Sequence, residues 1–289
     1  MIPLGRHDLV RPDATIRYWI RGRIDAPTVV LLHGATLDHR AWTPQLDELL
    51  RRYRIVLPDL RAHGESTGWF DFEATVRDVL ALLDGLPARR TVLVGLSLGA
   101  NVAQEIVRRE PDRALALVAA DTMCNTAERH PMAASATIVA LAAHAFLAGD
   151  TFAREAARHT ARTPAAQAYA VEANRHRSTR ETVSILTSLL TSALRPDPEY
   201  RLPVPALLLH GEYDSIGDIA TATAAWARRE PLAEYAVVPA AGHASNLDNP
   251  GAFTGLLMTF LERVVPAPVM LDSSLRVEER AGSPARELI

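Results

Sequence analysis

Five segments of the chain are short apolar runs that end at or just before a glycine, a proline or an aspartate. These runs lie at residues 28–34, 54–59, 91–95, 114–120 and 206–211. An uninterrupted apolar run of this length is typical of a strand that is buried on both faces of a sheet. Stretches with apolar residues at helical spacing separate the runs, at residues 42–50, 72–83 and 100–109. This alternation predicts the α/β fold class, with a mainly parallel central sheet flanked by helices.

One long interval interrupts this alternation. From about Met123 to Leu202 the sequence is rich in alanine and contains no strand-like run. Its predicted helices lie at residues 133–147, 152–162, 165–175 and 182–194. Because the interval begins where a predicted strand ends, we expect a helical insertion that lies over the edge of the sheet as a cap.

The pattern therefore divides the chain into three parts. We expect residues 1–122 and 203–265 to form the α/β core and residues 123–202 to form the helical cap. After Pro266 the sequence becomes a charged stretch. Residues 266–289 are expected to be a C-terminal tail that is poorly ordered or loosely docked.

A candidate nucleophile lies between a predicted strand and a predicted helix, in the sequence Gly95-Leu96-Ser97-Leu98-Gly99. A sharp turn from strand to helix strains the central serine and exposes its hydroxyl, and bulky residues two positions away on either side would clash. The glycines at those two positions meet this requirement. The pattern is common by itself, so its place between a strand and a helix carries the prediction.

A serine hydroxyl needs a base to take its proton, and a histidine in that role needs a carboxylate to orient it. His243 follows a glycine near the end of the core, and Asp214 follows the last apolar run. The chain order serine, acid, histidine is the one found with a nucleophile at a strand-to-helix turn. We expect Ser97 to be the nucleophile, His243 the base and Asp214 the orienting acid. Asp121 also ends a predicted strand and stays open as an alternative acid.

Attack on a carbonyl creates a negatively charged oxygen that needs hydrogen-bond donors. The backbone amide of Leu98, directly after the candidate nucleophile, is one expected donor. The amide of Ala35 is the other, because Gly34 lets the loop after the first apolar run bend toward the same place. These two amides form the predicted oxyanion hole.

Composition argues against several other functions. The formal net charge of -3 offers no basic surface to nucleic acid or to anionic membranes. All 31 cationic residues are arginine, which excludes a Schiff-base lysine and the lysine of a phosphate-binding loop. Cys124 is the only cysteine, so neither an intrachain disulfide nor a cysteine-built zinc site can form. The sequence also lacks a Gly-x-Gly-x-x-Gly dinucleotide motif and a His-Glu-x-x-His zinc motif, so we expect no cofactor and no metal.

The N-terminal residues and the hydropathy of the chain bear on its cellular compartment. The N-terminal residues contain no apolar stretch of signal-peptide length, and no run of about 18 apolar residues occurs that could span a bilayer. Together with the single cysteine, these features predict a cytoplasmic protein. Its expected partner is a small-molecule substrate, with no nucleic-acid and no membrane partner.

Five ordered blocks of the sequence carry a resemblance to a known superfamily. They are His33-Gly34-Ala35, Asp59-Leu60-Arg61-Ala62-His63-Gly64-Glu65-Ser66, Gly95-Leu96-Ser97-Leu98-Gly99, Gly211-Glu212-Tyr213-Asp214 and Gly242-His243. Across residues 8–265 the chain resembles the α/β-hydrolase superfamily. Within it, the chain is similar to small bacterial serine esterases and lactonases, including the 3-oxoadipate enol-lactonase and aclacinomycin methylesterase groups. Ala100, where many relatives have glycine, and the missing proline after Asp214 are departures that remove no catalytic group.

The residues and the resemblance together imply a serine hydrolase that cleaves a carboxylic ester or lactone of a small organic molecule through an acyl-enzyme intermediate. Relatives with an aspartate nucleophile, the haloalkane dehalogenases and epoxide hydrolases, are disfavoured by Ser97. Two alternatives stay open. The same fold and residues could perform perhydrolysis or cleave a carbon-carbon bond, or the protein could be a binding or receptor module with little turnover.

Overall fold

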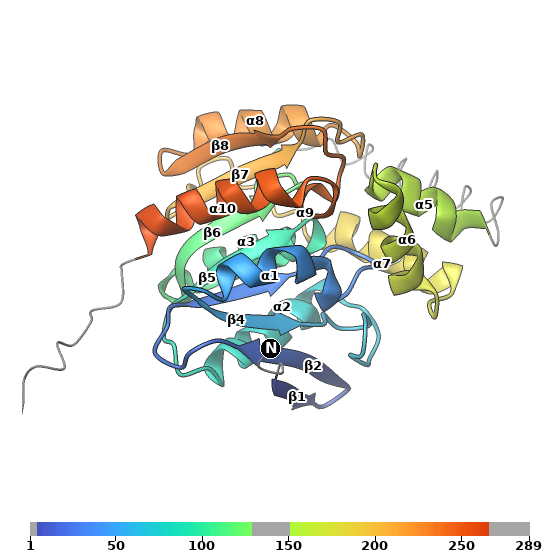
Figure 1. Ribbon diagram of the computed structural model, residues 1–289, viewed down its shortest axis with the longest axis horizontal. Coiled ribbons are helices and arrows are strands. Elements are labelled where there is room, and N and C mark those ends of the chain that lie inside the picture. Colours follow the sequence, from blue (N-terminus) through green and yellow to red (C-terminus); the bar gives the residue numbers. More distant parts are fainter. Residues whose placement is uncertain (1–4, 129–150, 266–289) are drawn as a thin grey trace, which may run out of the picture.

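The computed structural model describes residues 5–128 and 151–265 (Figure 1). In these residues one eight-stranded sheet has the strand order β1-β2-β4-β3-β5-β6-β7-β8. The strands are β1 (Gly5–Arg11), β2 (Ala14–Arg21), β3 (Thr28–Leu32), β4 (Arg54–Pro58), β5 (Thr91–Leu96), β6 (Ala114–Ala120), β7 (Ala206–Gly211) and β8 (Ala233–Val238). The strands from β4 to β8 in this order are parallel, whereas β1 and β2 join antiparallel at one edge. The predicted mainly parallel sheet is confirmed.

The five apolar runs form the centre of this sheet. They are observed as β3, β4, β5, β6 and β7, and nearly every residue in them is buried. The sequence pattern did not identify β1, β2 and β8, which form the two edges. Most residues of β1 are exposed, so this strand lacks the apolar run that marks the others.

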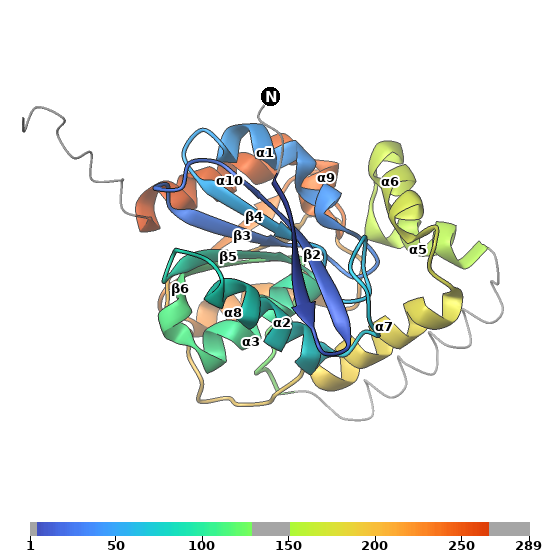
Figure 2. The ribbon, with the colours of Figure 1, turned by 90° about the horizontal axis from the view of Figure 1, so that it is seen from below.

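Helices cover both faces of the sheet. The helices of the core are η1 (His39–Trp42), α1 (Thr43–Leu49), α2 (Phe72–Asp84), α3 (Leu98–Arg109), η2 (Pro111–Arg113), α8 (Ile219–Arg229), α9 (Ser245–Asp248) and α10 (Pro250–Val264). Figure 2 shows α1, α9 and α10 on one face and α2, α3 and α8 on the other. The three helices predicted within the core are observed as α1, α2 and α3.

Local sequence explains where such a helix begins and which side it buries. The Asp71 side chain accepts a hydrogen bond from the Ala74 amide at 2.7 Å and so caps the start of α2. Phe72, Val76 and Val79 recur at helical spacing and are buried. The apolar stripe therefore sets the face of α2 that packs on the sheet.

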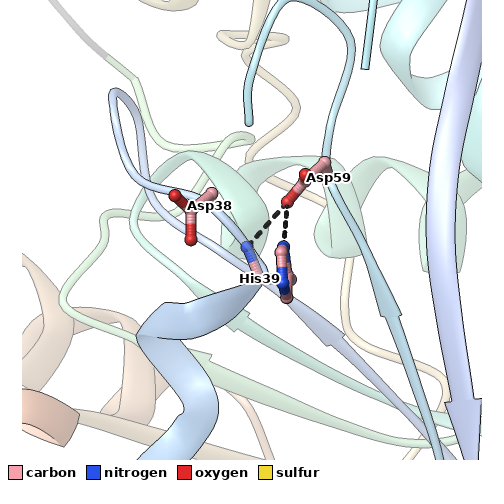
Figure 3. Close-up of side chains that lie close together, drawn as sticks. All are labelled: Asp38, His39 and Asp59. Carbon is pink, nitrogen blue, oxygen red and sulfur yellow. Dashed lines mark hydrogen bonds and ion pairs between the residues drawn. The ribbon is translucent and has the colours of Figure 1, made fainter. Parts of the chain in front are cut away.

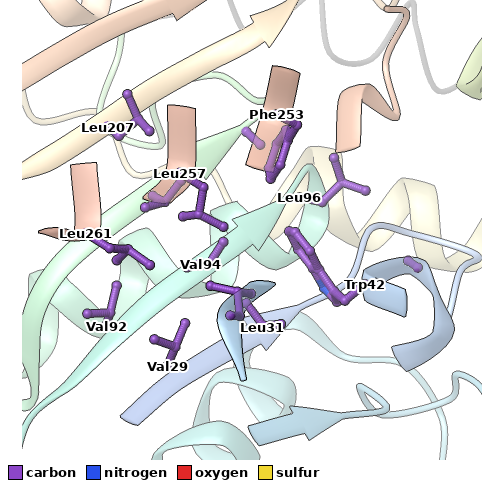
Figure 4. Close-up of a cluster of buried hydrophobic side chains, with 14 of the residues drawn as sticks. Val29, Leu31, Trp42, Val92, Val94, Leu96, Leu207, Phe253, Leu257 and Leu261 are labelled. Carbon is purple, nitrogen blue, oxygen red and sulfur yellow. The ribbon is translucent and has the colours of Figure 1, made fainter. Parts of the chain in front are cut away.

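Two apolar cores lie on the two faces of the sheet. On one face, alternate residues of β3 and β5 pack against Trp42 and against Phe253 and Leu257 of α10 (Figure 4). On the other face, the intervening strand residues pack against α2 and α3. Because side chains alternate along a strand, one apolar run supplies both cores. This double burial fixes the positions of the strand ends, where the candidate site lies.

The segment predicted as an insertion (residues 123–202, called the insertion below) follows β6 in the chain. Its described helices are α5 (Phe152–Thr160), α6 (Pro164–Asn174) and α7 (Thr179–Ser192), which gather beyond one end of the sheet in both views (Figures 1 and 2). They correspond to three of the four predicted helices. The predicted helix at 133–147 and the predicted tail at 266–289 lie outside the described residues. Within the described ranges, no helix combines the length and the apolar character needed to cross a bilayer.

Candidate active site

Ser97 lies at the sharp turn between β5 and α3. Its φ of 50° is in the left-handed region, which serine seldom adopts. A Cβ on Gly95 would lie 2.3 Å from the Ala100 amide nitrogen, and one on Gly99 would lie 2.1 Å from the Leu32 carbonyl oxygen. Both distances are impossible for a real Cβ, so glycine is required on both sides of the turn. The predicted strand-to-helix turn at Ser97 is observed.

A chain of hydrogen bonds connects Ser97, His243 and Asp214. The Ser97 Oγ lies 2.9 Å from Nε2 of His243, and Nδ1 of His243 lies 2.9 Å from Oδ2 of Asp214. With its proton on Nδ1, the imidazole donates to Asp214 and accepts from the serine hydroxyl. The three residues follow β5, β7 and β8, whose parallel carboxyl ends share one edge of the sheet. The structure therefore brings together all three predicted side chains.

The surroundings of His243 favour its charged form. Burial by itself lowers the pKa of His243, but the hydrogen bond and the negative charge of Asp214, with a further contribution from Asp121, outweigh burial and raise this pKa above 6.5. The Asp214 side chain is fully buried, and its Oδ1 accepts a hydrogen bond from the Ile216 amide at 2.9 Å. A carboxylate held in this way keeps the imidazole in one orientation and one tautomer.

Asp121, the alternative acid, has different partners. Its Oδ1 accepts a hydrogen bond from the Gly211 amide at 2.8 Å, and its Oδ2 accepts from the amide and the hydroxyl of Ser245, at 3.1 and 2.6 Å. Burial raises the pKa of Asp121 to about 7, while the charge of His243 lowers it and that of Asp214 raises it. Asp121 thus connects the segments that carry Asp214 and His243. The carboxylate that bonds the imidazole is Asp214.

The two predicted oxyanion donors belong to segments beside Ser97. Leu98 is the first residue of α3, where the amides have no partner within the helix and the helix dipole is positive. Ala35 lines the same cavity as Ser97. Ala35 lies in a turn that is closed by a hydrogen bond from the Leu37 amide to the Gly34 carbonyl at 3.2 Å.

A cavity of about 490 Å³ opens in front of Ser97 and His243. Besides these two, the core contributes Gly34, Ala35, Thr36, Leu37, Leu96, Asn101, Asp121, Thr122, Ile216 and Ile219. The insertion contributes Met123, Phe152, Ala156, His159, Thr160, Thr182, Leu186, Leu189, Leu190, Ala193 and Leu194. This volume suits a small organic molecule, and the lining is mostly aliphatic with polar groups near Ser97.

The walls of this cavity were not recognised in the sequence. Leu186, Leu189 and Leu190 recur at helical spacing in α7, so the apolar face of this helix could be recognised. The sequence predicts a cap over the edge of the sheet, but the pattern does not show which residues of that cap line the cavity. Ile216 and Ile219, just after Asp214, gave no comparable signal.

One group of potential metal ligands among the described residues consists of Asp38, His39 and Asp59 (Figure 3). Asp59 Oδ1 accepts hydrogen bonds from the backbone amide and Nδ1 of His39, both at 2.8 Å, and its Oδ2 accepts from the Glu65 amide at 2.7 Å. Asp38 forms an ion pair with Arg40 at 2.8 Å. Because protein donors already occupy these carboxylates, the cluster is explained as bracing between the segments that follow β3 and β4.

His33 and His63 have structural partners. The Nε2 of His33 accepts a hydrogen bond from the Leu60 amide at 2.9 Å, and Nδ1 of His63 donates to the Arg61 carbonyl at 2.8 Å. Burial lowers the pKa of both histidines, most strongly that of His63. Cys124 is a buried free thiol. None of these three side chains lines the cavity described above.

A comparison with protein families identifies the class of this protein. The model of the alpha/beta hydrolase family matches residues 29–256. Since this match covers most of the chain, the chain belongs to the α/β-hydrolase family. The resemblance inferred from the sequence is confirmed.

Individual relatives agree with this assignment. A pimeloyl-(acyl-carrier protein) methyl ester esterase of Chromobacterium violaceum is 32% identical over 251 residues, which cover 82% of this chain and 94% of that protein. The 3-oxoadipate enol-lactonase 2 of Acinetobacter baylyi is 23% identical and covers 88% of this chain and 96% of its own. A thermophilic esterase from Thermogutta terrifontis superposes with a TM-score of 0.76 at 25% identity, over 90% of this chain and 99% of that one.

Proposed function

We propose that the protein is a serine hydrolase that cleaves a carboxylic ester or lactone of a small organic molecule. The observation that carries this proposal is the continuous chain of hydrogen bonds from Ser97 through His243 to Asp214. Ser97 and His243 line a cavity whose walls are mostly aliphatic. In the family to which the chain belongs, relatives are named as an ester esterase and an enol-lactonase. These names support the same class of substrate here.

The first half of the proposed reaction forms an acyl-enzyme. The Ser97 Oγ attacks the substrate carbonyl carbon while Nε2 of His243 takes the hydroxyl proton. Asp214 stabilises the imidazolium that results. The amides of Ala35 and Leu98 donate hydrogen bonds to the oxyanion. When the tetrahedral intermediate collapses, the carbon-oxygen bond breaks and the alcohol leaves with the proton from His243.

The second half of the reaction restores the enzyme. Water attacks the acyl carbonyl and gives a proton to Nε2 of His243. The carbon-oxygen bond to Ser97 then breaks, and the proton returns to the serine hydroxyl. The products are a carboxylic acid and an alcohol, or a hydroxy acid when the substrate is a lactone. The proposed reaction uses only side chains, backbone amides and water.

We further propose that the insertion, residues 123–202, acts as a cap on a core formed by residues 1–122 and 203–265. Leucines of α7 line the cavity together with Ser97 and His243. Such a cover excludes water and selects the substrate. Aliphatic walls favour an acyl or alcohol group that is itself apolar.

The test is turnover of p-nitrophenyl esters with acyl chains of two to eight carbons, combined with labelling by a fluorophosphonate. We expect multiple turnovers and one adduct on the peptide that contains Ser97. Ser97→Ala should abolish both, whereas Ser184→Ala, which changes an exposed serine of α7, should preserve both. Labelling that persists in Ser97→Ala would show that the nucleophile is another residue.

The same assay, extended by two further substrates, separates this proposal from a receptor, a perhydrolase and a carbon-carbon bond hydrolase. A receptor with this fold would bind a phosphonate slowly or not at all and would show no ester turnover. A perhydrolase would form peracid when hydrogen peroxide is added to the ester assay. A carbon-carbon bond hydrolase would cleave a vinylogous diketone faster than any ester in the panel.

A further inference from the structure

The insertion contacts the β3 loop (residues 33–38), which carries the proposed oxyanion donor Ala35. Two polar side chains of the insertion make these contacts. Tyr169 comes from α6, and Arg177 comes from the segment between α6 and α7. The loop after β3 is thus held by residues far away in the sequence as well as by its own turn.

Tyr169 binds the end of the β3 loop. Its hydroxyl accepts a hydrogen bond from the Asp38 amide at 3.3 Å and lies 3.1 Å from both the carbonyl oxygen and Oδ1 of Asp38, to which it can donate. Burial, and then the negative charge of Asp38, raise the pKa of Tyr169, so the phenol keeps its proton. Arg40 reinforces this contact through ion pairs of 2.8 Å to both Asp38 and Glu172 of α6.

Arg177 binds the middle of the β3 loop. Its guanidinium donates to the Thr36 carbonyl at 3.4 Å, to the Ala62 carbonyl at 2.7 Å and to Oδ1 of Asn174 at 2.8 Å. Burial lowers the pKa of Arg177, although the guanidinium stays charged. A planar group with several donors can join two carbonyl oxygens from different loops in this way.

Both carbonyl partners of Arg177 belong to residues in the left-handed region. Thr36 has φ of 66° and Ala62 has φ of 62°. A β-branched residue such as Thr36 rarely adopts this conformation, which persists only where surrounding contacts hold it. Thr36 directly follows Ala35 in the turn closed between Gly34 and Leu37. The Ala35 amide therefore lies in a turn whose next residue is strained and is bonded by the insertion.

We infer that Tyr169 and Arg177 are positioning residues that hold the Ala35 amide at the oxyanion. The inference rests on the proposed function, because it assigns these residues to the transition state of that reaction. Neither side chain lines the cavity, so their effect reaches the substrate through the β3 loop. The insertion then has two roles, since it covers the substrate and also completes the oxyanion hole.

This inference predicts a loss of turnover without a loss of substrate binding. Interactions made only in the transition state change kcat and leave KM unchanged. For p-nitrophenyl acetate, whose short acyl group needs little of the cavity, Arg177→Ala should lower kcat about ten- to one-hundredfold, because misdirecting one oxyanion donor costs about that much. Tyr169→Phe, which keeps the ring, should show a smaller loss of the same kind.

Two controls separate positioning from general damage. Arg175→Ala changes an exposed arginine two residues away that contacts the His176 ring, and it should leave kcat unchanged. Millimolar guanidinium chloride should restore part of the kcat of Arg177→Ala, because the ion can occupy the space between the two carbonyls. Sodium chloride at equal ionic strength should restore nothing, and circular dichroism should show that the variants are folded.

The inference is overturned if Arg177→Ala keeps the parental kcat, or if its loss lies in KM alone. A loss that guanidinium does not restore, in a variant that melts at a much lower temperature, would also overturn it, because the role would then be structural. The proposed function fails separately. If Ser97→Ala retains turnover in the same assay, the reaction itself is misassigned, whatever Arg177→Ala shows.

Discussion

Two aspartates with buried side chains follow the neighbouring strands β6 and β7 and lie close to His243, and their hydrogen-bond partners distinguish them. Asp214 bonds the imidazole, where in the proposed reaction its carboxylate stabilises the positive charge that arises when Ser97 loses its proton. Asp121 bonds Gly211 and Ser245, which lie a few residues from Asp214 and His243. Asp214 is therefore placed to stabilise the charge of His243, and Asp121 is placed to hold together the segments that carry Asp214 and His243.

This difference leads to a prediction about two matched variants. Asp214→Asn should lower kcat on the order of 10³- to 10⁴-fold, because the amide favours the wrong tautomer of the imidazole. Asp121→Asn should lower kcat less than about tenfold, since it changes the support and leaves the imidazole bond intact. Steady-state kinetics on one p-nitrophenyl ester measures both. The reverse order of the two losses would assign the acid to Asp121.

The pKa of His243 predicts the pH dependence. The base must be neutral, and Asp214 raises its pKa above the ordinary 6.5, so kcat/KM should rise with pH through the region above 6.5 and then level off. In Asp214→Asn the pH at which the residual kcat/KM increases should be lower than in the parent protein. The reason is that the hydrogen bond and the charge that raised the pKa of His243 are gone. Profiles of kcat/KM from pH 5 to 9 check this, and an unshifted profile would contradict it.

The same shift has a consequence for stability. A histidine whose pKa is raised on folding stabilises the fold below its unfolded pKa, and this contribution is lost as pH rises through the folded pKa. The protein is thus expected to be most active at pH values where this contribution is already declining.

At the scale of elements, the insertion is attached to the core beside the site. The Ala244 amide donates to the Thr160 carbonyl at 2.7 Å. The Asp248 carboxylate accepts hydrogen bonds from the amides of Gly242, Arg162 and Thr163, at 2.8 to 2.9 Å. The link between α5 and α6 is therefore bound to the segment that carries His243.

The apolar face of α7 leads to a prediction about substrate specificity that tests the proposed cap. Leu190→Trp should fill part of the cavity and lower kcat/KM for an octanoyl ester at least about tenfold, while the acetyl ester changes less than about threefold. A panel of p-nitrophenyl esters of increasing length measures the ranking. Thr191→Ala, at the exposed neighbouring position, is the matched control. An unchanged ranking in Leu190→Trp would contradict the role of a cap.

At the scale of the whole molecule, the sheet with its two apolar cores holds the strand ends in place. Leu257 of α10 is fully buried in the core that also contains Val94 of β5 and Phe253 of the same helix (Figure 4). It does not line the cavity. Stability and catalysis can therefore be perturbed separately.

A cavity in this core should reduce stability and spare the chemistry. Leu257→Ala should lower the free energy of unfolding by about 2–5 kcal/mol, because it removes buried methyl groups from a close-packed core. Thr259→Ala, on the exposed side of the same helix, should change it by less than about 0.5 kcal/mol. Urea unfolding measures both, with ester turnover at low temperature as a check on the site. A loss below about 1 kcal/mol in Leu257→Ala would contradict this account of the core.

The sequence alone determined the central strands and the turn at Ser97. A strand buried on both faces must be apolar at consecutive positions, so β3 to β7 are visible as runs. The turn needs glycine at Gly95 and Gly99 for steric reasons that act within a few residues. Both signals are local, and the sequence records local constraints directly. By contrast, β1, β2 and β8 lie toward the edges of the sheet and are partly exposed, so they contain no apolar run. Their extended structure depends on pairing with the neighbouring strand.

Only the tertiary structure decided which groups meet. Both Asp121 and Asp214 follow strands, and the direction of each side chain at the sheet edge places Asp214 against His243. The walls of the cavity and the contacts of Tyr169 and Arg177 with the β3 loop join residues more than a hundred positions apart. Such contacts leave no periodic pattern in the chain, because they depend on how the insertion packs on the core. The turn at Ser97 thus follows from local sequence, whereas its pairing with His243 and Asp214 and the walls of the cavity exist only in the folded molecule.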